Sequence, residues 1–155
     1  MALHFSIKEF SNRKRDVLNA MEEQNLDALL MFRQESMYWL TGYDTFGYVF
    51  FQTLVLDITG NVVLLTRAPD LRQAQNTSNI NDIRIWVDKD GINPSDDLKL
   101  ILNELDLKNK NIGVEYEAYG MTGRNALRLN KSLENYCKVE DQSELITKLR
   151  VIKSN

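Results

Sequence analysis

Short apolar runs alternate with amphipathic helical segments, and this alternation limits the fold more than any other feature of the sequence. The run over 28–32 is apolar at every position, which is typical of a strand buried on both faces of a sheet. Further strands are predicted over 49–58, 62–66, 83–87, 112–116 and 136–139. Helices are predicted over 6–24, 35–40, 69–77, 122–133 and from residues 95 and 141 onward. This order predicts an α/β fold of three layers, α/β/α, with helices on both faces of one sheet.

One pair of predicted strands is joined by a very short connection. Thr59-Gly60-Asn61 has the composition of a tight turn, and it separates the runs over 49–58 and 62–66. These two runs therefore form a β-hairpin. Since the remaining strands are separated by helices, we expect a mixed, mainly parallel sheet that contains this one hairpin.

Four predicted helices begin at residues whose side chains can accept a hydrogen bond from the free amides of the first turn. Two of these starts have the spacing of a capping box, in which an acidic residue three positions later bonds back to the cap. The residues are Ser6 with Glu9, Ser95, Thr122, and Asp141 with Glu144.

Composition excludes several classes of protein. The 155 residues suit one domain, and a net charge of −3 gives no basic footprint for nucleic acid or an anionic membrane. The basic run over 13–15 is expected to be a solvated helix face. No apolar run approaches the roughly 20 residues that span a bilayer, and the N-terminus lacks the pattern of a secretory signal. Cys137 is the only cysteine, which fits a reducing compartment, so we expect a cytoplasmic protein.

The sequence offers no credible catalytic set. His4 is the only histidine and lies close to the N-terminus, so neither a zinc site of nitrogen and sulfur ligands nor a nucleophile–histidine pair is expected. The acidic pairs Glu22-Glu23 and Asp96-Asp97 fall at predicted helix ends, where solvated carboxylates are common. We therefore expect no catalytic residue, metal or cofactor in this chain.

The segment over 38–51 is unusually aromatic, with seven aromatic residues in fourteen positions. Three of them, Trp39, Phe50 and Phe51, are expected in the core. The others of interest are Tyr43, Phe46 and Tyr48, which fall in a predicted turn that contains Gly42 and Gly47. Exposed aromatic side chains are favoured at interfaces and ligand sites, so this turn is predicted to be a contact loop.

At this segment the sequence resembles the N-terminal domain of the creatinase/prolidase family, a group that includes Xaa-Pro peptidases and creatine amidinohydrolase. The likeness covers nearly the whole chain and consists of several short motifs in the family's order. They are Phe10-Ser11-Asn12-Arg13, Leu26-Asp27-Ala28-Leu29-Leu30, Met37-Tyr38-Trp39-Leu40-Thr41-Gly42-Tyr43, Gly60 through Leu65-Thr66-Arg67, Ile112-Gly113-Val114-Glu115, and Ser143-Glu144-Leu145-Ile146 leading to Leu149-Arg150-Val151-Ile152-Lys153-Ser154.

The resemblance implies that the chain is one part of a larger hydrolase. Residues 1–150 would be the N-terminal domain, and 151–155 would start the junction to a catalytic domain that this chain lacks. That domain would hold a pair of divalent metal ions in the peptidases and no metal in creatinase. The helical pattern that is still running at Ile152 agrees with an interrupted chain.

The resemblance also implies a homodimer in which the N-terminal domain of one subunit reaches the active-site mouth of the other. Phe46 matches the aromatic residue that contacts substrate across the dimer in creatinase, and Tyr48 stands where creatinase has an arginine. The predicted contact residues are Tyr43, Asp44, Phe46, Tyr48 and Arg67.

Two questions stay open from the sequence, namely the substrate and whether a catalytic parent exists at all. If the chain belongs to a larger hydrolase, the substrate is an Xaa-Pro peptide, creatine or ectoine, and the sequences of the segments over 33–38, 42–48 and 65–72 are most similar to ectoine-hydrolase-like members. The other alternative is a free-standing module that binds a small molecule or a protein and has no catalytic parent.

Overall fold

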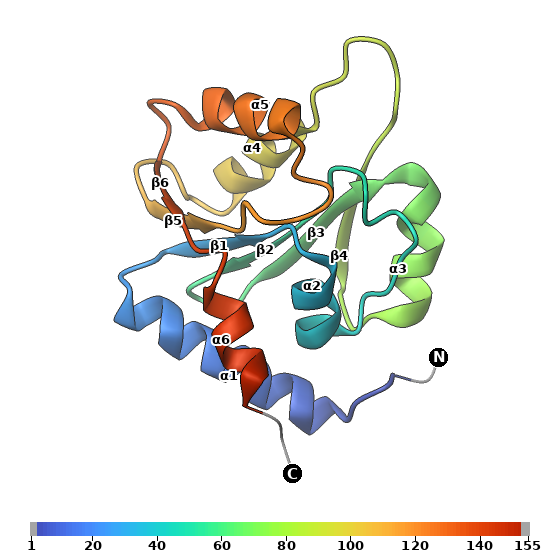
Figure 1. Ribbon diagram of the computed structural model, residues 1–155, viewed down its shortest axis with the longest axis vertical. Coiled ribbons are helices and arrows are strands. Elements are labelled where there is room, and N and C mark those ends of the chain that lie inside the picture. Colours follow the sequence, from blue (N-terminus) through green and yellow to red (C-terminus); the bar gives the residue numbers. More distant parts are fainter. Residues whose placement is uncertain (1–2, 153–155) are drawn as a thin grey trace.

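A six-stranded sheet separates two layers of helices (Figure 1). The computed structural model describes residues 3–152, so the predicted junction over 151–155 lies outside the described residues from position 153 onward. In chain order the elements are α1 (Ile7–Glu23), β1 (Ala28–Met31), α2 (Gln34–Thr41), β2 (Thr53–Asp57), β3 (Val62–Arg67), the 3-10 helix η1 (Ala68–Asp70), α3 (Leu71–Thr77), β4 (Asp82–Trp86), α4 (Pro94–Glu104), β5 (Asn111–Val114), α5 (Gly123–Leu133), β6 (Lys138–Asp141) and α6 (Leu145–Val151).

The sheet is mixed and mainly parallel, as predicted. Its strand order is β4-β3-β2-β1-β5-β6. Only β2 runs antiparallel to its neighbours β1 and β3, while the other neighbouring pairs are parallel. The hairpin between β2 and β3 is confirmed, and its turn is held by Asp57, whose carboxylate accepts a 2.9 Å hydrogen bond from the Asn61 amide.

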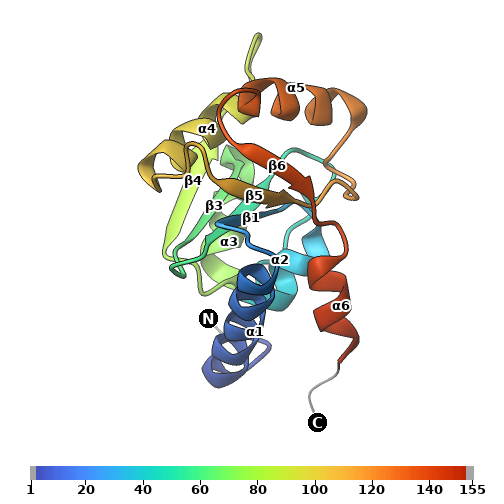
Figure 2. The ribbon, with the colours of Figure 1, turned by 90° about the vertical axis from the view of Figure 1, so that its left-hand side faces the viewer.

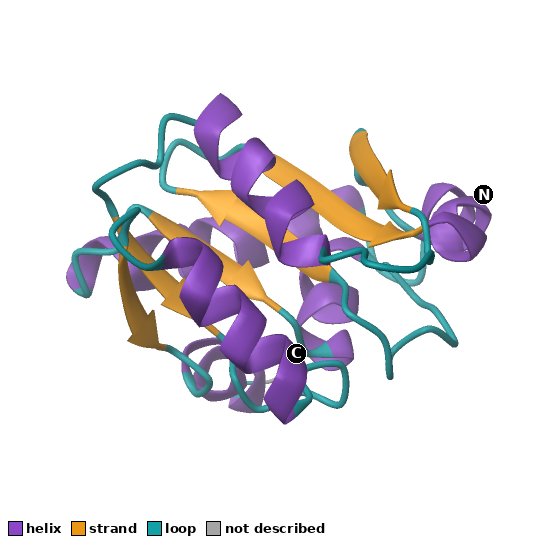
Figure 3. Cartoon of the chain, turned by 90° about the horizontal axis from the view of Figure 1, so that it is seen from above, coloured by secondary structure: helices purple, strands orange, loops and turns teal. Residues whose placement is uncertain are grey.

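Each face of the sheet has its own hydrophobic core. One core lies beneath α4 and α5, which cover the strands when the molecule is viewed from above (Figure 3). The other lies against α1, α2, α3 and α6, and α1 and α6 pack side by side (Figures 1 and 2). Leu29 and Leu30 are fully buried and belong to different cores, so the prediction that this strand is buried on both faces is confirmed.

Two of the four predicted helix caps are confirmed as hydrogen bonds. The Ser6 hydroxyl accepts from the Glu9 amide at 3.1 Å, and the Thr122 hydroxyl accepts from the Asn125 amide at 3.2 Å. The Glu9 carboxylate, however, pairs with Arg13 at 2.9 Å instead of returning to Ser6. The capping box at Ser6 is therefore only half formed.

The other two predicted caps are wrong. Asn93 caps α4, with its side chain accepting from the Ser95 amide at 3.1 Å, because Pro94 occupies the first turn and places the cap before it. Asp141 accepts from the Ser143 amide at 3.0 Å in a local turn. The cap position of α6 is Glu144, which makes no side-chain cap bond.

Arg13 does not lie on a solvated helix face as predicted. Its side chain is buried, with the guanidinium 4.0 Å from the centre of the Phe5 ring and 5.2 Å from that of Trp39. It also donates to the Trp39 carbonyl oxygen at 2.8 Å. An arginine can be buried in this way because its flat guanidinium stacks on rings while its hydrogen bonds are satisfied.

Three predicted strands differ from the sheet by more than one residue at an end, and the one predicted over 112–116 forms only Asn111–Val114. The run over 49–58 contributes only Thr53–Asp57 to the sheet, because the Phe50 amide closes a turn on the Gly47 carbonyl at 3.0 Å. The last strand begins at Lys138 rather than 136, and Tyr136 is buried in the core beneath α4 and α5. Among the helices within residues 3–152, none is both long and apolar enough to cross a membrane.

Candidate functional site

The loop over 42–52 connects α2 to β2 at the end of the sheet where β1 and β3 terminate. Pairing of Met31 with Leu54 shows that β2 begins where β1 ends, and β3 ends with Arg67 at the same end of the sheet. In open α/β sheets, ligand sites lie outside the carboxyl ends of the parallel strands. The predicted contact loop therefore lies at the carboxyl ends of β1 and β3, where such a site is expected.

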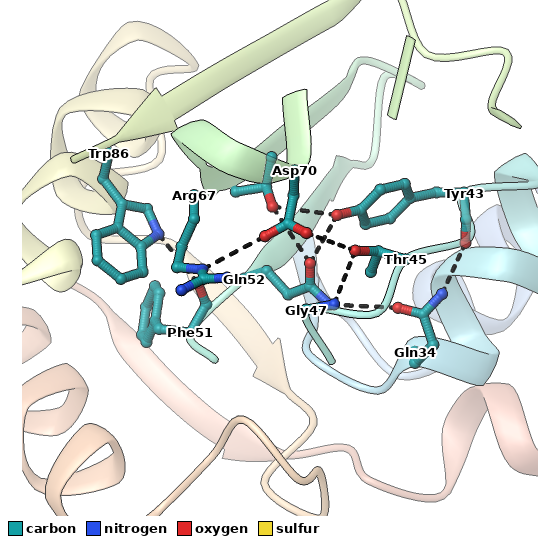
Figure 4. A network of polar contacts seen from close by, with 10 residues as sticks. Gln34, Tyr43, Thr45, Gly47, Phe51, Gln52, Arg67, Asp70 and Trp86 are labelled. Atoms are coloured by element: carbon teal, nitrogen blue, oxygen red, sulfur yellow. Dashed lines mark hydrogen bonds and ion pairs between the residues drawn. The ribbon is translucent and has the colours of Figure 1, made fainter. Parts of the chain in front are cut away.

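Tyr43 anchors this loop from the inside and is not exposed, contrary to the sequence-based expectation. Its side chain is fully buried, and its hydroxyl donates to Gln52 Oε1 at 2.7 Å and lies 3.1 Å from the Thr66 hydroxyl (Figure 4). Gln34 Nε2 donates to the Tyr43 carbonyl oxygen at 2.8 Å. Burial raises the pKa of the Tyr43 hydroxyl, so the group stays protonated as a donor.

A second group of contacts fixes the middle of the loop on the start of α3. Thr45 donates to Asp70 Oδ1 at 2.7 Å and accepts from the Gly47 amide at 2.9 Å (Figure 4). Arg67 Nε lies 3.4 Å from Asp70 Oδ2. A Cβ atom on Gly47 would lie 2.5 Å from the same Asp70 oxygen, so a larger residue here would have to displace the Asp70 carboxylate.

The buried half of the loop supports an exposed aromatic half. Phe46 is 90% exposed, and Tyr48, Val49 and Phe50 are between 40% and 46% exposed. Phe50 therefore does not lie in the core as predicted. It serves instead as a platform for Arg67, whose guanidinium carbon lies 3.5 Å from the ring centre. Phe51 is buried as predicted.

The five predicted contact residues do not form one cluster. Phe46 and Tyr48 lie in the exposed part of the loop, over 46–50, and the Arg67 guanidinium contacts this part by stacking on Phe50. Asp44 is exposed but lines a separate hollow of ≈ 380 Å³ that also contains Trp39. Trp39 itself is half-buried rather than fully in the core.

Glu115 is a buried acidic residue to which the sequence assigned no role. Its Oε1 accepts from the amides of Phe32 and Arg33 at 3.1 Å each, and its Oε2 accepts from the Ser36 hydroxyl at 2.6 Å. Burial raises its pKa from 4.5 to about 7. A lone Glu directly after an apolar strand marks the position in the sequence, but its partners are about 80 residues away along the chain.

Tyr119 was also missed. Its ring is 76% exposed and meets the Tyr48 ring edge to face, with 5.7 Å between the ring centres. Tyr119 follows β5 in a segment that contains no aromatic cluster of its own. Only the folded structure brings it to the loop over 42–52.

The described residues offer no reaction centre of a familiar type. Within residues 3–152, no three His, Cys, Asp or Glu side chains are placed to hold a metal ion, so this part of the chain does not fit the metal pair that the resemblance implies for a catalytic domain. His4 pairs with the Tyr38 hydroxyl at 2.5 Å and with no nucleophile among these residues. Burial raises the pKa of the Cys137 thiol to about 11, which leaves it protonated at neutral pH.

The fold and the loop together define a class of protein, namely an α/β domain that presents an anchored aromatic loop at the carboxyl ends of its parallel strands. The model of the creatinase/prolidase N-terminal domain matches residues 13–152 of this sequence. The chain belongs to that family of N-terminal domains.

Two curated relatives cover almost the whole chain. The chain is 31% identical over 160 residues to a protein of Sinorhizobium fredii named "uncharacterized hydrolase/peptidase y4tM", and 26% identical over 168 residues to the ectoine hydrolase of Halomonas elongata. These matches include 98% and 99% of the chain but only 40% of each relative. The chain therefore spans about 40% of the length of these proteins and corresponds to the N-terminal domain of a hydrolase and peptidase family.

Solved structures show the same fold. The chain superposes on an Xaa-Pro aminopeptidase from Streptococcus pyogenes with a TM-score of 0.74 and 19% identity, covering 94% of this chain and 100% of that one. It superposes on a dipeptidase from Pyrococcus horikoshii with a TM-score of 0.73 and 23% identity, covering 92% of this chain and 37% of that one. These likenesses establish the creatinase/prolidase type of N-terminal fold for this chain.

Proposed function

We propose that this domain, formed by residues 1–150, serves a C–N bond hydrolase without taking part in the chemistry itself. In this proposal the enzyme is a homodimer, and the exposed half of the loop over 42–52 contacts substrate at the active-site mouth of the partner subunit. A catalytic domain would follow the junction over 151–155 and would supply any divalent metal pair that the reaction needs.

The observation that carries the proposal is the contrast between the two halves of this loop. Tyr43 and Thr45 are buried and their hydroxyl groups are hydrogen-bonded, whereas Phe46 is 90% exposed. Exposed aromatic rings are unfavourable in water, while rigid ones lose little entropy on binding. The anchored backbone on either side of Phe46 places this ring at the surface, where it is suited to orienting a ligand and excluding water from it.

The contact residues in this proposal have different parts. Phe46 and Tyr48 touch the substrate. Arg67, which stacks on Phe50 and whose charge is offset by Asp70, contributes its remaining guanidinium N–H groups beside them. Tyr43 positions the loop from the interior. Asp44 faces a different hollow and would contact the neighbouring domain rather than the same ligand group.

The substrate class is proposed from the relatives. One curated relative is an ectoine hydrolase, and structural neighbours include an Xaa-Pro aminopeptidase and a dipeptidase. We therefore expect hydrolysis of ectoine or of an Xaa-Pro peptide, with creatine as the remaining option from the family. A cytoplasmic location is proposed on the basis of the single cysteine.

Kinetics of the full-length enzyme test this proposal. Phe46→Ala and Tyr48→Ala are expected to lower kcat/KM for ectoine or for L-alanyl-L-proline without changing the melting temperature or the dimer. Leu100→Ala is the matched control, because Leu100 is also an exposed apolar residue, 62% exposed on α4, but it lies away from the loop. Unchanged kinetics in both loop variants would reject the substrate contact.

A free-standing binding module is the second candidate function. It is favoured by the ≈ 380 Å³ hollow that contains Asp44, because three aromatic residues, Phe5, Tyr38 and Trp39, line it. This reading predicts that the 155-residue chain alone binds a small molecule. A gene that continues into a catalytic domain rich in Asp, His and Glu would rule it out.

A further inference from the structure

The segment over 115–122, which links β5 to α5, lies directly against the exposed turn over 47–50. Gly120 makes the contact. A Cβ atom at this position would lie 2.2 Å from the Phe50 carbonyl oxygen and 3.3 Å from that of Tyr48. The two segments therefore touch backbone to backbone, which only glycine permits at this separation.

This second segment is itself held in place. The Asn125 side chain donates to the Gly120 carbonyl oxygen at 2.8 Å, and the Met121 amide donates to the Ala118 carbonyl oxygen at 3.0 Å. Met121 is buried in the core beneath α4 and α5. The segment is thus a fixed support against which the turn over 47–50 rests.

The support carries an exposed ring of its own. Tyr119 is 76% exposed, and its ring makes an angle of 69° with that of Tyr48. An edge-to-face pair restricts the orientation of both rings and leaves their outer surfaces open. Tyr48 and Tyr119 together form one aromatic surface from two segments that are about 70 residues apart in the sequence.

We infer that Tyr119 is a further substrate-contact residue that helps to determine specificity, and that Gly120 is a positioning residue for the turn that carries Tyr48. The inference rests on the proposed function and extends it to a second loop. The surface is built from ring edges and faces, so it receives an apolar part of the substrate, such as a side chain or the methylene edge of a ring.

The first test compares Tyr119→Ala, Tyr119→Phe and Leu127→Ala in the full-length enzyme with ectoine and L-alanyl-L-proline as substrates. Leu127 is the matched control because it is 74% exposed and lies on α5. Tyr119→Ala should raise KM about three- to tenfold, the loss expected for one aromatic contact, while kcat changes little. Tyr119→Phe should restore KM, and Leu127→Ala should have no effect.

The second test uses a pair of glycine variants. Gly120→Ala should raise KM although Tyr119 is intact, because the added methyl group displaces the turn over 47–50. Gly123→Ala is the control, since a Cβ atom there would meet no atom within 4 Å. Should Gly120→Ala fail to fold, the Tyr119 variants decide the question alone.

The outcomes separate this inference from the proposed function. Altered KM in the Phe46 and Tyr48 variants with an unchanged Tyr119→Ala enzyme would overturn the inference and leave the proposed function standing. A loss in Tyr119→Phe as large as in Tyr119→Ala would also overturn it, because the hydroxyl and not the ring would then make the contact. An enzyme whose kinetics are unaffected by any of these changes would overturn both.

Discussion

The buried carboxylate of Glu115, at the end of β5, accepts a 2.6 Å hydrogen bond from the hydroxyl of Ser36 in the first turn of α2. The same carboxylate accepts hydrogen bonds from the amides of Phe32 and Arg33, so it fixes the segment that leads into α2 from a different part of the chain. The carboxylate therefore fixes the start of α2, the helix that precedes the contact loop.

The raised pKa of Glu115 predicts a specific pH dependence of stability. Between pH 4.5 and about 7 the folded protein retains a proton that the unfolded chain has released, so the free energy of unfolding falls as pH rises through this window. Glu115→Gln keeps the hydrogen bonds if the Ser36 hydroxyl turns to accept one. The variant should therefore gain stability relative to the unsubstituted protein on going from pH 4.5 to 8, by on the order of 3 kcal/mol.

Urea unfolding of both proteins across this pH range measures the difference. Comparison of the two cancels other titrating groups, such as Asp82 and Asp141, whose lowered pKa values give the opposite slope at acidic pH. Parallel stability curves for the two proteins would show that Glu115 does not titrate in this window.

A second prediction concerns two buried threonines at the same edge of the sheet. The Thr53 hydroxyl has no hydrogen-bond partner among the described residues, whereas the Thr66 hydroxyl contacts both Tyr43 and Gln52. Thr53→Val should raise the free energy of unfolding by about 1 kcal/mol, and Thr66→Val should lower it by about 1–3 kcal/mol. Thermal or chemical unfolding distinguishes the two. Equal losses in both variants would mean that Thr53 has a partner after all.

A third prediction concerns the start of α4. Asn93→Ala should cost about 1 kcal/mol because it removes the cap, and Ser95→Ala should be neutral or slightly stabilising because the Ser95 hydroxyl is buried without a partner among residues 3–152. Unfolding experiments on the two variants provide the measurement. The reverse ranking would restore Ser95 as the functional cap.

Asn93 and Ser95 also illustrate which features could be predicted from the sequence. Periodicity and turn composition predicted the helices, the hairpin and the mixed sheet, because these depend on neighbours within a few residues. The predicted cap of α4 was Ser95, whereas Asn93 is the cap because Pro94, a residue favoured in the first helical turn, directly follows it.

The tertiary contacts could not be predicted from the sequence. The sequence placed Phe50 in the core and Arg13 in solvent. Arg13 is buried because its guanidinium stacks on Phe5 and Trp39, and Phe50 is 40% exposed because it closes a surface turn on Gly47. The contact loop was predicted from its aromatic content, yet its division into a buried anchor at Tyr43 and an exposed tip at Phe46 depends on Gln52 and Thr66. No local pattern encodes these pairings.

The last prediction concerns the fixed position of the contact loop. Gly47→Ala would place a methyl group 2.5 Å and 2.7 Å from the two carboxylate oxygens of Asp70, which Thr45 and Arg67 hold in place. The variant should lose about 1–3 kcal/mol of stability and become more susceptible to proteolysis at the turn over 47–50. Gly123→Ala, where a Cβ atom meets open space, should be neutral.

A double-mutant cycle with Asp70→Ala separates a steric clash from a general effect of alanine. If the carboxylate is the obstacle, Gly47→Ala should cost clearly less in the Asp70→Ala protein than in the unsubstituted one, because the clashing atoms are gone. Equal costs in the two backgrounds would place the need for glycine in the backbone itself. Since Gly47 stands between Phe46 and Tyr48, a confirmed clash would show that Asp70 sets the position of the backbone that carries both exposed rings.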